Sequence, residues 1–389
     1  MPSLLGGMTI TIIGGGLAGL VAAIECAERG EDVVLHEARS HLGGRARSST
    51  GDFVANHGPH VVYADGALWS WLDARGLARP AKKPPVTGVR FRHAGAIHRT
   101  PPAKVLAVLR LLRAPAPDDV SFRDWVASKT DMGTAELASR LCHVFTFHHD
   151  PGSHAASFVA ERARRAFTLP PTARYVVGGW GAMVARLEDR ALDDGVRIEL
   201  QSKVETVDGP TIVATELAAA RKLLGDESLR WPGARTAFLD VGLATRRGDP
   251  FLVVDLDAGV FAERYTAPDP TLAPAGHQLV QAQVGLRDDE SLEDGVATIE
   301  RLFDDTFRGW RDREVWRRRF VLTDASGALD PPGSTWRDRP AIDRGDDVYL
   351  CGDMVAAPGL LGEVSVASAV EAATLACSRA GSRRRSTAV

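Results

Sequence analysis

Cysteine and long apolar runs are scarce in this chain. Its 389 residues include four cysteines, Cys26, Cys142, Cys351 and Cys377, and no two of them form a C-x-x-C pair. This spacing argues against a disulfide framework and against the common zinc motifs. No segment reaches the ~18 consecutive apolar residues of a membrane span, and the first residues lack the basic start and apolar stretch of a signal peptide. We therefore expect a cytoplasmic protein without a stable membrane span.

Charge of one sign is not in excess either. The chain has 47 basic and 50 acidic residues, for a net charge of −3, so there is no electrostatic reason to expect a nucleic acid partner. Lysine is rare: six of the basic residues are lysine, and the last of them is Lys222. The hydrophobic content of 44% is that of an ordinary globular protein, and the length allows about two or three domains.

The most informative segment lies near the start of the chain. Residues 9–20 read TITIIGGGLAGL, a β-branched apolar run that predicts a buried parallel strand, followed by a G-x-G-x-x-G turn and a helical pattern. In such a turn Gly14 allows the tight bend, Gly16 lets the backbone approach a pyrophosphate, and Gly19 allows close helix–strand packing. A second apolar run then ends at Glu37, which is placed to accept hydrogen bonds from ribose hydroxyls. The segment predicts dinucleotide binding.

A second glycine turn follows directly. Gly43 and Gly44 permit close backbone approach, and the guanidinium of Arg45 can fork onto phosphate oxygens. This addition is typical of flavoproteins rather than of nicotinamide dehydrogenases. In these two segments the expected cofactor contacts are Gly14, Gly16, Leu17, Ala18, Gly19, Glu37, Ala38, Gly43, Gly44 and Arg45.

The end of the chain contains a third cofactor segment. A strand VYLCGD stops on Gly352 and Asp353, and ligands of open α/β sheets bind at the carboxyl ends of strands. Asp353 could accept hydrogen bonds from the ribityl hydroxyls of a flavin. A helix that starts near Gly362 would point its N–H groups at the flavin pyrimidine ring.

Together these segments resemble the FAD-dependent superfamily that includes amine oxidases, protoporphyrinogen oxidase and phytoene desaturases. The run from Tyr175 to Thr215 is similar to the second FAD segment of that superfamily, and NHGPH (residues 56–60) and residues 267–277 are similar to its phytoene dehydrogenase-like branch. The resemblance implies non-covalent FAD. It also implies cofactor contacts from Gly58, Pro59, His60, Val204, Gly352, Asp353, Gly362, Glu363 and Val364.

The expected fold is α/β, with a Rossmann-type FAD-binding domain and a discontinuous α+β substrate domain built of a mixed sheet plus helices. The FAD-binding domain should comprise residues 8–65, 190–215 and 340–380, and the substrate domain residues 66–189 and 216–339. Within the latter, the apolar helix at residues 103–115 could lie on a membrane or line a substrate entrance, but its pattern favours a surface helix.

The resemblance implies an FAD-dependent oxidoreductase, of the dehydrogenase, desaturase or oxidase type. It would abstract hydride from a small to medium, mostly apolar organic substrate and pass the electrons to oxygen, a quinone or another acceptor. Many amine oxidases place a lysine from their C-terminal half near the flavin, and residues 223–389 contain no lysine. The alternatives are an amine oxidase with an atypical active site, a non-redox flavoenzyme (isomerase, cyclase or mutase) that uses reduced FAD, and a non-catalytic FAD-binding protein.

Few residues suit acid–base roles. His57 and His60 would pass near the flavin; His60 is the candidate for proton transfer, although a structural role is favoured for both. Glu363 could cap the last helix, face the flavin or act as a base. The four histidines between His143 and His154 match no strong ligand spacing, so no metal is expected. We expect core packing for Trp180 and Trp336.

Overall fold

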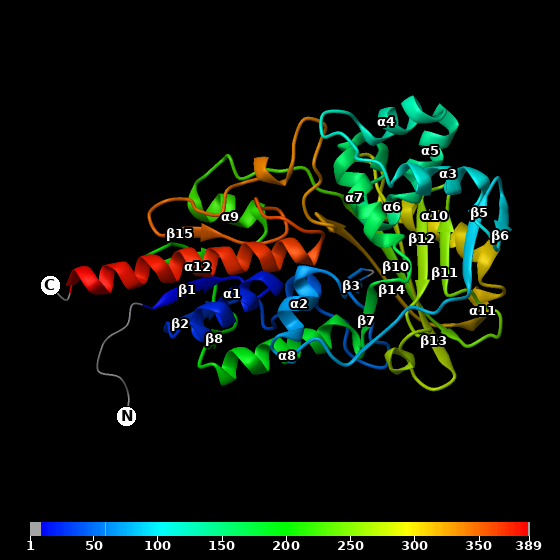
Figure 1. Ribbon diagram of the computed structural model, residues 1–389. Coiled ribbons are helices and arrows are strands. Elements are labelled where there is room, and N and C mark those ends of the chain that lie inside the picture. The colour runs from blue at the N-terminus through cyan, green and yellow to red at the C-terminus, as the bar shows by residue number, and fades with distance from the viewer. Residues whose placement is uncertain (1–8, 59, 388–389) are drawn as a thin grey trace.

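The computed structural model describes residues 9–58 and 60–387, and it contains two main sheets at opposite ends of the molecule (Figure 1). The first is a five-stranded parallel sheet with the order β15-β9-β1-β2-β8. Its strands are β1 (Ile10–Ile13), β2 (Val33–His36), β8 (Arg197–Glu199), β9 (Thr211–Val213) and β15 (Val348–Leu350). Chain order reverses between β1 and β9, and a switch of this kind is where open α/β sheets bind ligands.

Five helices among the described residues share one apolar core with this sheet, because its strands are apolar and buried. They are α1 (Leu17–Glu28), α2 (Ala67–Asp73), α8 (Gly179–Asp193), α9 (Leu217–Leu224) and α12 (Gly362–Thr387). The longest helix, α12, lies beside α1, so the end of the chain lies against its start (Figure 1). The first strand begins at Ile10, one residue later than the sequence predicts.

The second sheet has seven strands in the order β14-β10-β13-β12-β11-β5-β6, and it is antiparallel except between β11 and β5. Its strands are β5 (Val89–His93), β6 (Ala96–His98), β10 (Arg235–Ala244), β11 (Leu252–Asp255), β12 (Val260–Arg264), β13 (His277–Gly285) and β14 (Glu314–Thr323). A small sheet, β3-β7-β4, joins β3 (Val62–Tyr63), β7 (Ala173–Val176) and β4 (Ala81–Lys82).

The two faces of the seven-stranded sheet differ in chemistry. Ala237, Leu239 and Val241 of β10 belong to an aliphatic core with α10 (Leu292–Thr306), which closes one face. Phe238 and Asp240, which alternate with them, point to the other face. On that face Phe238 lies against Gly58, so the segment expected to pass near the flavin packs on this sheet.

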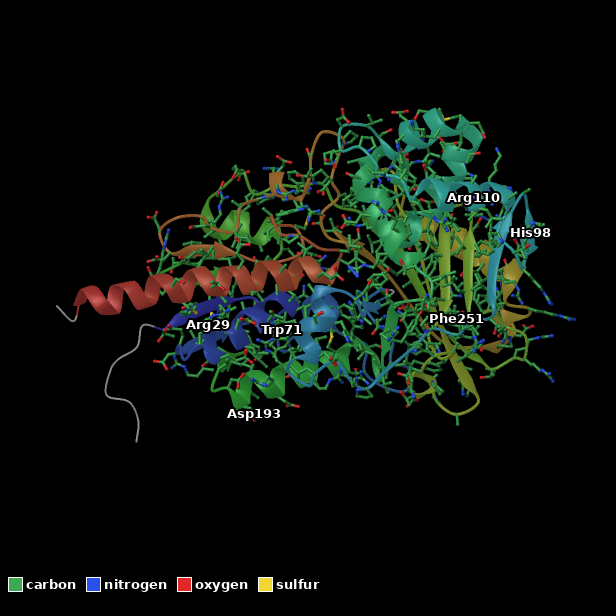
Figure 2. The ribbon with its side chains drawn as sticks, viewed as in Figure 1. Arg29, Trp71, His98, Arg110, Asp193 and Phe251 are labelled. Carbon is green, nitrogen blue, oxygen red and sulfur yellow. The ribbon has the colours of Figure 1, made fainter. Side chains whose placement is uncertain are left out.

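Short helices form a layer over this sheet, and α11 (Trp310–Arg313) leads into β14 (Figure 1). The layer contains α3 (Ala103–Leu111), α4 (Phe122–Lys129), α5 (Met132–Leu141), α6 (His143–Thr146) and α7 (Ala156–Ala166). The chain also has four 3₁₀ turns, η1 (Gly44–Ala46), η2 (Pro151–Ser153), η3 (Pro270–Leu272) and η4 (Trp336–Asp338), among the described residues. In Figure 2, Arg110 lies at the end of α3, and His98 lies on β6 at the outer edge of the sheet.

The predicted fold class is confirmed: a Rossmann-type parallel sheet stands beside a mixed sheet with helices. The domain boundaries given above stay a prediction. Trp180 is buried as expected, but Trp336 is only half-buried, and the Arg337 guanidinium carbon lies 4.2 Å from its ring centre. Within residues 9–58 and 60–387, no helix is long and apolar enough to cross a membrane.

Candidate dinucleotide-binding site

Three glycines shape the turn after β1, and each has different surroundings. Gly14 adopts a φ of +109°, and a Cβ there would lie 2.8 Å from the carbonyl oxygen of Ala214. A Cβ on Gly19 would lie 1.8 Å from the carbonyl oxygen of Gly14, so helix α1 touches the strand backbone at this point. A Cβ on Gly16, by contrast, would meet no atom within 4 Å. The turn therefore leaves open space at the glycine where a pyrophosphate needs close approach.

The start of α1 suits an anion. Gly16 is its N-cap and provides no side-chain hydrogen bond, and the first turn contains no acidic residue. The N–H groups of the first turn, which includes Leu17 and Ala18, therefore keep the positive end of the helix dipole without a carboxylate. A phosphate placed beside Gly16 would lie at this end.

Glu37 lies at the carboxyl end of β2, where its carboxylate is fixed by the backbone. Oε2 accepts a hydrogen bond from the Gly15 N–H at 2.8 Å, and Oε1 accepts one from Arg39 at 2.8 Å. Ala38, next to it, is exposed. The Glu37 carbonyl oxygen accepts from Ser202 at 2.9 Å, which brings the segment of Val204 to the same edge of the sheet. Glu37, Ala38 and the segment of Val204, which are predicted cofactor contacts, therefore lie at the same edge of the sheet.

The second glycine turn folds back onto the first. The N–H of Gly43 donates to the carbonyl oxygen of Gly15 at 2.8 Å, and a Cβ on Gly44 would lie 3.4 Å from the Gly16 Cα. Both glycines have positive φ, +102° and +53°, a conformation that glycine adopts without strain. This contact places Arg45 next to the first glycine turn, where a pyrophosphate is predicted to bind.

Arg45 forms an ion pair with Asp353, and its Nη2 lies 2.7 Å from the Asp353 Oδ1. It also donates to the carbonyl oxygen of Asp324. Burial opposes the charge of Arg45, but Asp353 outweighs it and raises the pKa of the guanidinium. The residue predicted to bind phosphate and the residue predicted to bind the ribityl chain thus meet across 308 positions of sequence. The sequence did not single out Asp324.

The start of α12 lies against the start of α1. A Cβ on Gly362 would lie 3.4 Å from the Leu17 side chain and 3.5 Å from the Trp180 ring. Gly352, which follows β15, has a φ of +148°, and a Cβ there would meet no atom within 4 Å. Val364 is buried in the same core. At this end of the sheet, Gly362 therefore allows a close contact between helices, and Gly352 borders an open space.

Glu363 is buried, with 5% of its surface exposed. Its Oε2 accepts a hydrogen bond from the Leu360 N–H at 3.1 Å, as expected for a cap, and both carboxylate oxygens lie 3.3 Å from Nη2 of Arg165. Burial raises the pKa of Glu363. Arg165, on α7, was not predicted, since no local signal in the sequence links it to the last helix. A catalytic role for Glu363 stays a prediction.

His57 and His60 are both held by hydrogen bonds. Nε2 of His60 lies 3.1 Å from the carbonyl oxygen of Arg45, and its ring stacks on Trp180 at 4.5 Å. Nε2 of His57 accepts from Arg47 at 3.1 Å. Burial lowers the pKa of each histidine to about 4, so both are neutral at pH 7. The predicted proton-transfer role of His60 stays a prediction, and Pro59 lies outside the described residues.

Trp180 provides a test of whether a flavin fits beside these groups. Its indole Nε1 is buried without a hydrogen-bond partner among the described residues, and its ring lies between His60 and the start of α12. A buried donor of this kind normally has a partner. Gly16 and Gly352 provide open space, and Trp180 Nε1 provides a free donor for a group with acceptor oxygens and nitrogens, so the residues present fit FAD.

Three of the histidines between His143 and His154 have their rings in contact: the ring centre of His148 lies 4.2 Å from His149 in a tilted pair and 4.6 Å from His154 in an edge-on pair. Nδ1 of His143 donates to the His148 carbonyl oxygen at 2.9 Å when it carries the proton. No group of three or more metal-binding side chains is present in the part of the chain that the structure describes.

The glycine turns, the acidic residue after β2 and the parallel sheet define a Rossmann-type fold. Residues 12–74 match the model of the NAD(P)-binding Rossmann-like domain. The sequence is similar to 4,4'-diapolycopen-4-al dehydrogenase of Metabacillus indicus, with 23% identity over 57% of this chain and 54% of that protein. The chain therefore spans about half the length of this curated relative.

Solved structures cover nearly the whole chain. An oxidoreductase from Methanosarcina mazei superposes with a TM-score of 0.78 at 15% identity, over 94% of this chain and 99% of that one. Cyclohexylamine oxidase from Brevibacterium oxydans superposes with a TM-score of 0.72 at 16% identity, over 96% and 99%. The chain shares its fold with these structures, and the comparisons confirm the predicted resemblance to the superfamily of FAD-dependent amine oxidases and phytoene desaturases.

Proposed function

We propose that this protein binds FAD non-covalently and is an oxidoreductase that removes hydride from a carbon atom of a small to medium organic substrate. The observation that carries the proposal is the convergence of four distant segments on one end of the parallel sheet. The open side of Gly16, the carboxylate of Glu37, the Arg45–Asp353 pair and the start of α12 all lie there. The superfamily fold supports the same function.

Each segment would have a separate task. The N-terminus of α1 and Arg45 would hold the pyrophosphate, Glu37 the adenosine ribose, and Asp353 the ribityl chain. The bound flavin supplies the hydride acceptor. The start of α12 would stabilise negative charge on the ring, because the helix presents its positive end there. The protein would contribute mainly position, since binding must hold the reacting C–H bond against the ring.

The chain's lysines support a dehydrogenase or desaturase rather than an amine oxidase of the usual kind. Lys222 is exposed on α9, and residues 223–389 contain no lysine. Non-covalent binding is supported by the cysteine nearest to the cofactor segments, because Cys351 is buried and burial raises the pKa of its thiol above the usual range. Oxygen or a quinone would take the electrons.

The visible absorption spectrum of the purified protein, before and after acid precipitation, tests the proposal. We expect a flavin spectrum that moves to the supernatant, where the cofactor is identified as FAD. A colourless protein that gains no spectrum with added FAD would overturn it in favour of nicotinamide binding or a degenerate site. Gly16→Val should lose FAD but keep its circular dichroism, because the added side chain fills open space. Gly19→Val is the matched comparison and should disturb the fold itself.

A further inference from the structure

Arg162 on α7 is a buried cation without a carboxylate partner. It is 4% exposed, and none of the ion pairs among the described residues includes it. Its guanidinium stacks on Phe158 at 3.5 Å, and Nη1 makes a long hydrogen bond of 3.5 Å to the Phe158 carbonyl oxygen. Its Nε is buried and has no partner. An arginine in this state is costly, because burying a charge requires a partner and full hydrogen bonding.

The next arginine on the same face of α7 differs. Arg165 forms an ion pair with Asp65 at 2.7 Å and with Glu363 at 3.3 Å, and its guanidinium carbon lies 5.5 Å from the Tyr63 ring centre. Tyr63 is also close enough to Arg162 to interact with it electrostatically. Arg162 therefore lies about one helical turn from a residue that reaches the start of α12.

The Asp330 carboxylate, which acts electrostatically on Arg162, already accepts hydrogen bonds from other residues. Arg339, which is also buried, donates to both oxygens of Asp330 at 2.8 Å, and Asp330 accepts from the Trp231 indole as well. Nη1 of Arg339 is nevertheless buried and has no partner. Burial and the repulsion from Arg339 lower the pKa of Arg162 to about 9, which still leaves it charged at neutral pH. Asp330 thus pairs with Arg339 and leaves Arg162 without an ion pair among the described residues.

A third unsatisfied group completes the cluster. His154 is 6% exposed, its ring lies 6.0 Å from Phe158, and its Nε2 is buried without a partner. Arg162 and His154 both lie against Phe158, whose ring centre is 3.5 Å from the guanidinium carbon and 6.0 Å from the imidazole. In its neutral form the ring can donate one N–H. Asp330, the partner of Arg339, also accepts a backbone hydrogen bond at 3.0 Å from Ala155, the neighbour of His154. The unfilled donor positions of Arg162, Arg339 and His154 therefore belong to one cluster, in which one guanidinium has no counter-charge among the described residues.

We propose that this cluster, Arg162, Arg339 and His154, binds the carboxylate of an organic substrate whose reacting carbon is thereby held at the flavin. The inference rests on the proposed function and specifies its substrate class: an apolar body with one anionic group, rather than a wholly apolar molecule. A carboxylate would neutralise the excess charge and accept hydrogen bonds from the free guanidinium N–H groups, which are strong when both partners are ionised. Inorganic phosphate shares this chemistry and is distinguished by experiment.

Thermal melting in hexanoate tests the site and needs no turnover. The test compares the wild type, Arg162→Met, and the control Arg164→Met, which changes an exposed arginine of the same helix. Hexanoate should raise the Tm of the wild type and of the control, whereas hexanol at the same concentration should not. Arg162→Met should weaken hexanoate binding by about tenfold or more, the loss expected for a charged hydrogen-bonding partner. Arg162→Lys, which keeps the charge, should retain part of the shift if Arg162→Met fails to fold.

The outcomes separate the two sources of anion. A shift with hexanoate that clearly exceeds the shift with inorganic phosphate supports the substrate site. Equal shifts with both would overturn the substrate assignment and leave a site for small free anions. No shift in the wild type, or an unchanged shift in Arg162→Met, would overturn the site altogether. The flavin spectrum of the same samples is a separate readout: FAD without a hexanoate effect refutes this inference alone, and a hexanoate effect without FAD refutes the proposed function alone.

Discussion

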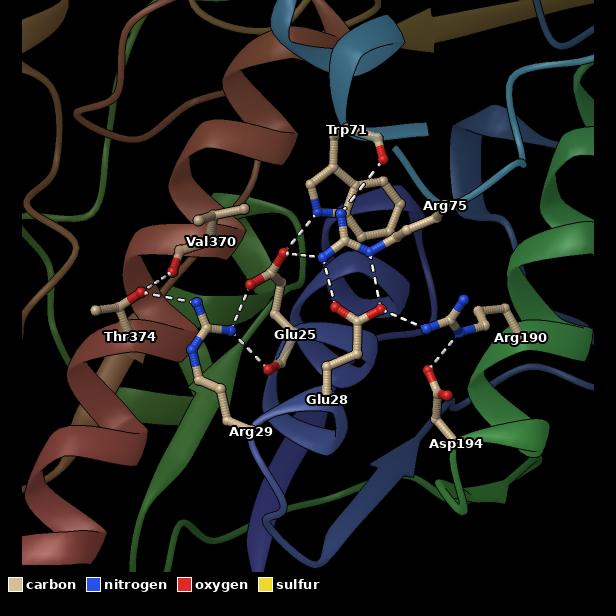
Figure 3. A network of polar contacts seen from close by, with 9 residues as sticks. All are labelled: Glu25, Glu28, Arg29, Trp71, Arg75, Arg190, Asp194, Val370 and Thr374. Atoms are coloured by element: carbon tan, nitrogen blue, oxygen red, sulfur yellow. Dashed lines mark hydrogen bonds and ion pairs between the residues drawn. The ribbon is translucent and has the colours of Figure 1, made fainter. Parts of the chain in front are cut away.

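Two clusters of charge, each built around a buried residue, differ in how many of their buried donors and acceptors have hydrogen-bond partners. Around Glu25 on α1, the carboxylate accepts from the Trp71 indole at 2.7 Å and from Arg75 at 2.7 Å, and it also pairs with Arg29. The Glu28 carboxylate accepts hydrogen bonds from Arg75 and Arg190. The network therefore joins α1, α2, α8 and α12 (Figure 3). Around Arg162, by contrast, several buried donors have no acceptor among the described residues.

The difference separates a structural network from a candidate binding site. In the first cluster each carboxylate has guanidinium partners and each buried donor has an acceptor, so nothing remains to bind a ligand. In the second, the positive charges exceed the negative, and three polar atoms lack partners. A native protein keeps such an arrangement at a cost in stability, and the cost is offset when a ligand of opposite charge binds.

Removal of the central carboxylate from the complete network should have the largest effect. Glu25→Leu leaves Arg75, Arg29 and the Trp71 indole without their shared acceptor, and Glu25 is only 5% exposed. We expect the free energy of unfolding to fall by about 3 kcal/mol or more, measured by urea denaturation. Unchanged stability would show that the network is not structural.

Acid should weaken the incomplete cluster, because it contains a buried neutral histidine. Burial lowers the pKa of His154 to about 3, so the unfolded chain binds this proton below pH 6.5 while the folded chain does not. Stability from this group is therefore complete above pH 6.5 and is lost as the pH falls from 6.5 towards 3. His154→Phe should remove about 1–3 kcal/mol of the loss measured between pH 7 and pH 4. Identical pH profiles would contradict the burial of a neutral histidine here.

Arg162→Met should have the opposite sign to Glu25→Leu. In buffer without organic anions it replaces an unpaired buried charge by an apolar chain of similar length, and we expect a gain of about 1 kcal/mol. The measurement is again urea denaturation, with Arg164→Met as the control. A loss of stability would mean that Arg162 is satisfied by the protein itself.

The smallest effect is expected at an exposed pair. Lys203 and Glu205 lie 3.0 Å apart with more than two thirds of each side chain exposed. Glu205→Gln should change the free energy of unfolding by less than about 0.5 kcal/mol. A larger change would indicate that exposed ion pairs in this protein cannot serve as a baseline for the two buried clusters.

Local patterns of the sequence predicted the parallel sheet well, because the glycine turn and the apolar strands are signals within a few residues. Strand β14 was missed: its sequence EVWRRRFVLT places three arginines in succession. The middle one, Arg318, turns inward because Asp240 on the neighbouring strand accepts from it at 2.6 Å. Asp240 is 78 positions away from Arg318 in the sequence, so no local pattern predicts their contact.

The candidate site shows the same limit. The sequence named Arg45 and Asp353 separately, but their contact depends on how the last strand joins the first sheet. The Arg162 cluster was not predicted at all, since His154, Arg162 and Arg339 come from three segments without a shared motif. An unsatisfied buried atom is a property of packing, and it becomes visible only when every neighbour is in place.

The position of β15 and α12 has a consequence for the timing of synthesis. The parallel sheet needs a strand at residues 348–350, and α1 needs a helix from residue 362 onward to cover its face. A ribosome must therefore make nearly the whole chain before the first 40 residues can complete their packing. Until then, the apolar surface of α1 stays exposed to water and to other proteins. Late closure of this kind makes folding slow and favours aggregation, and a cofactor supplied during translation would find its site complete only at the end.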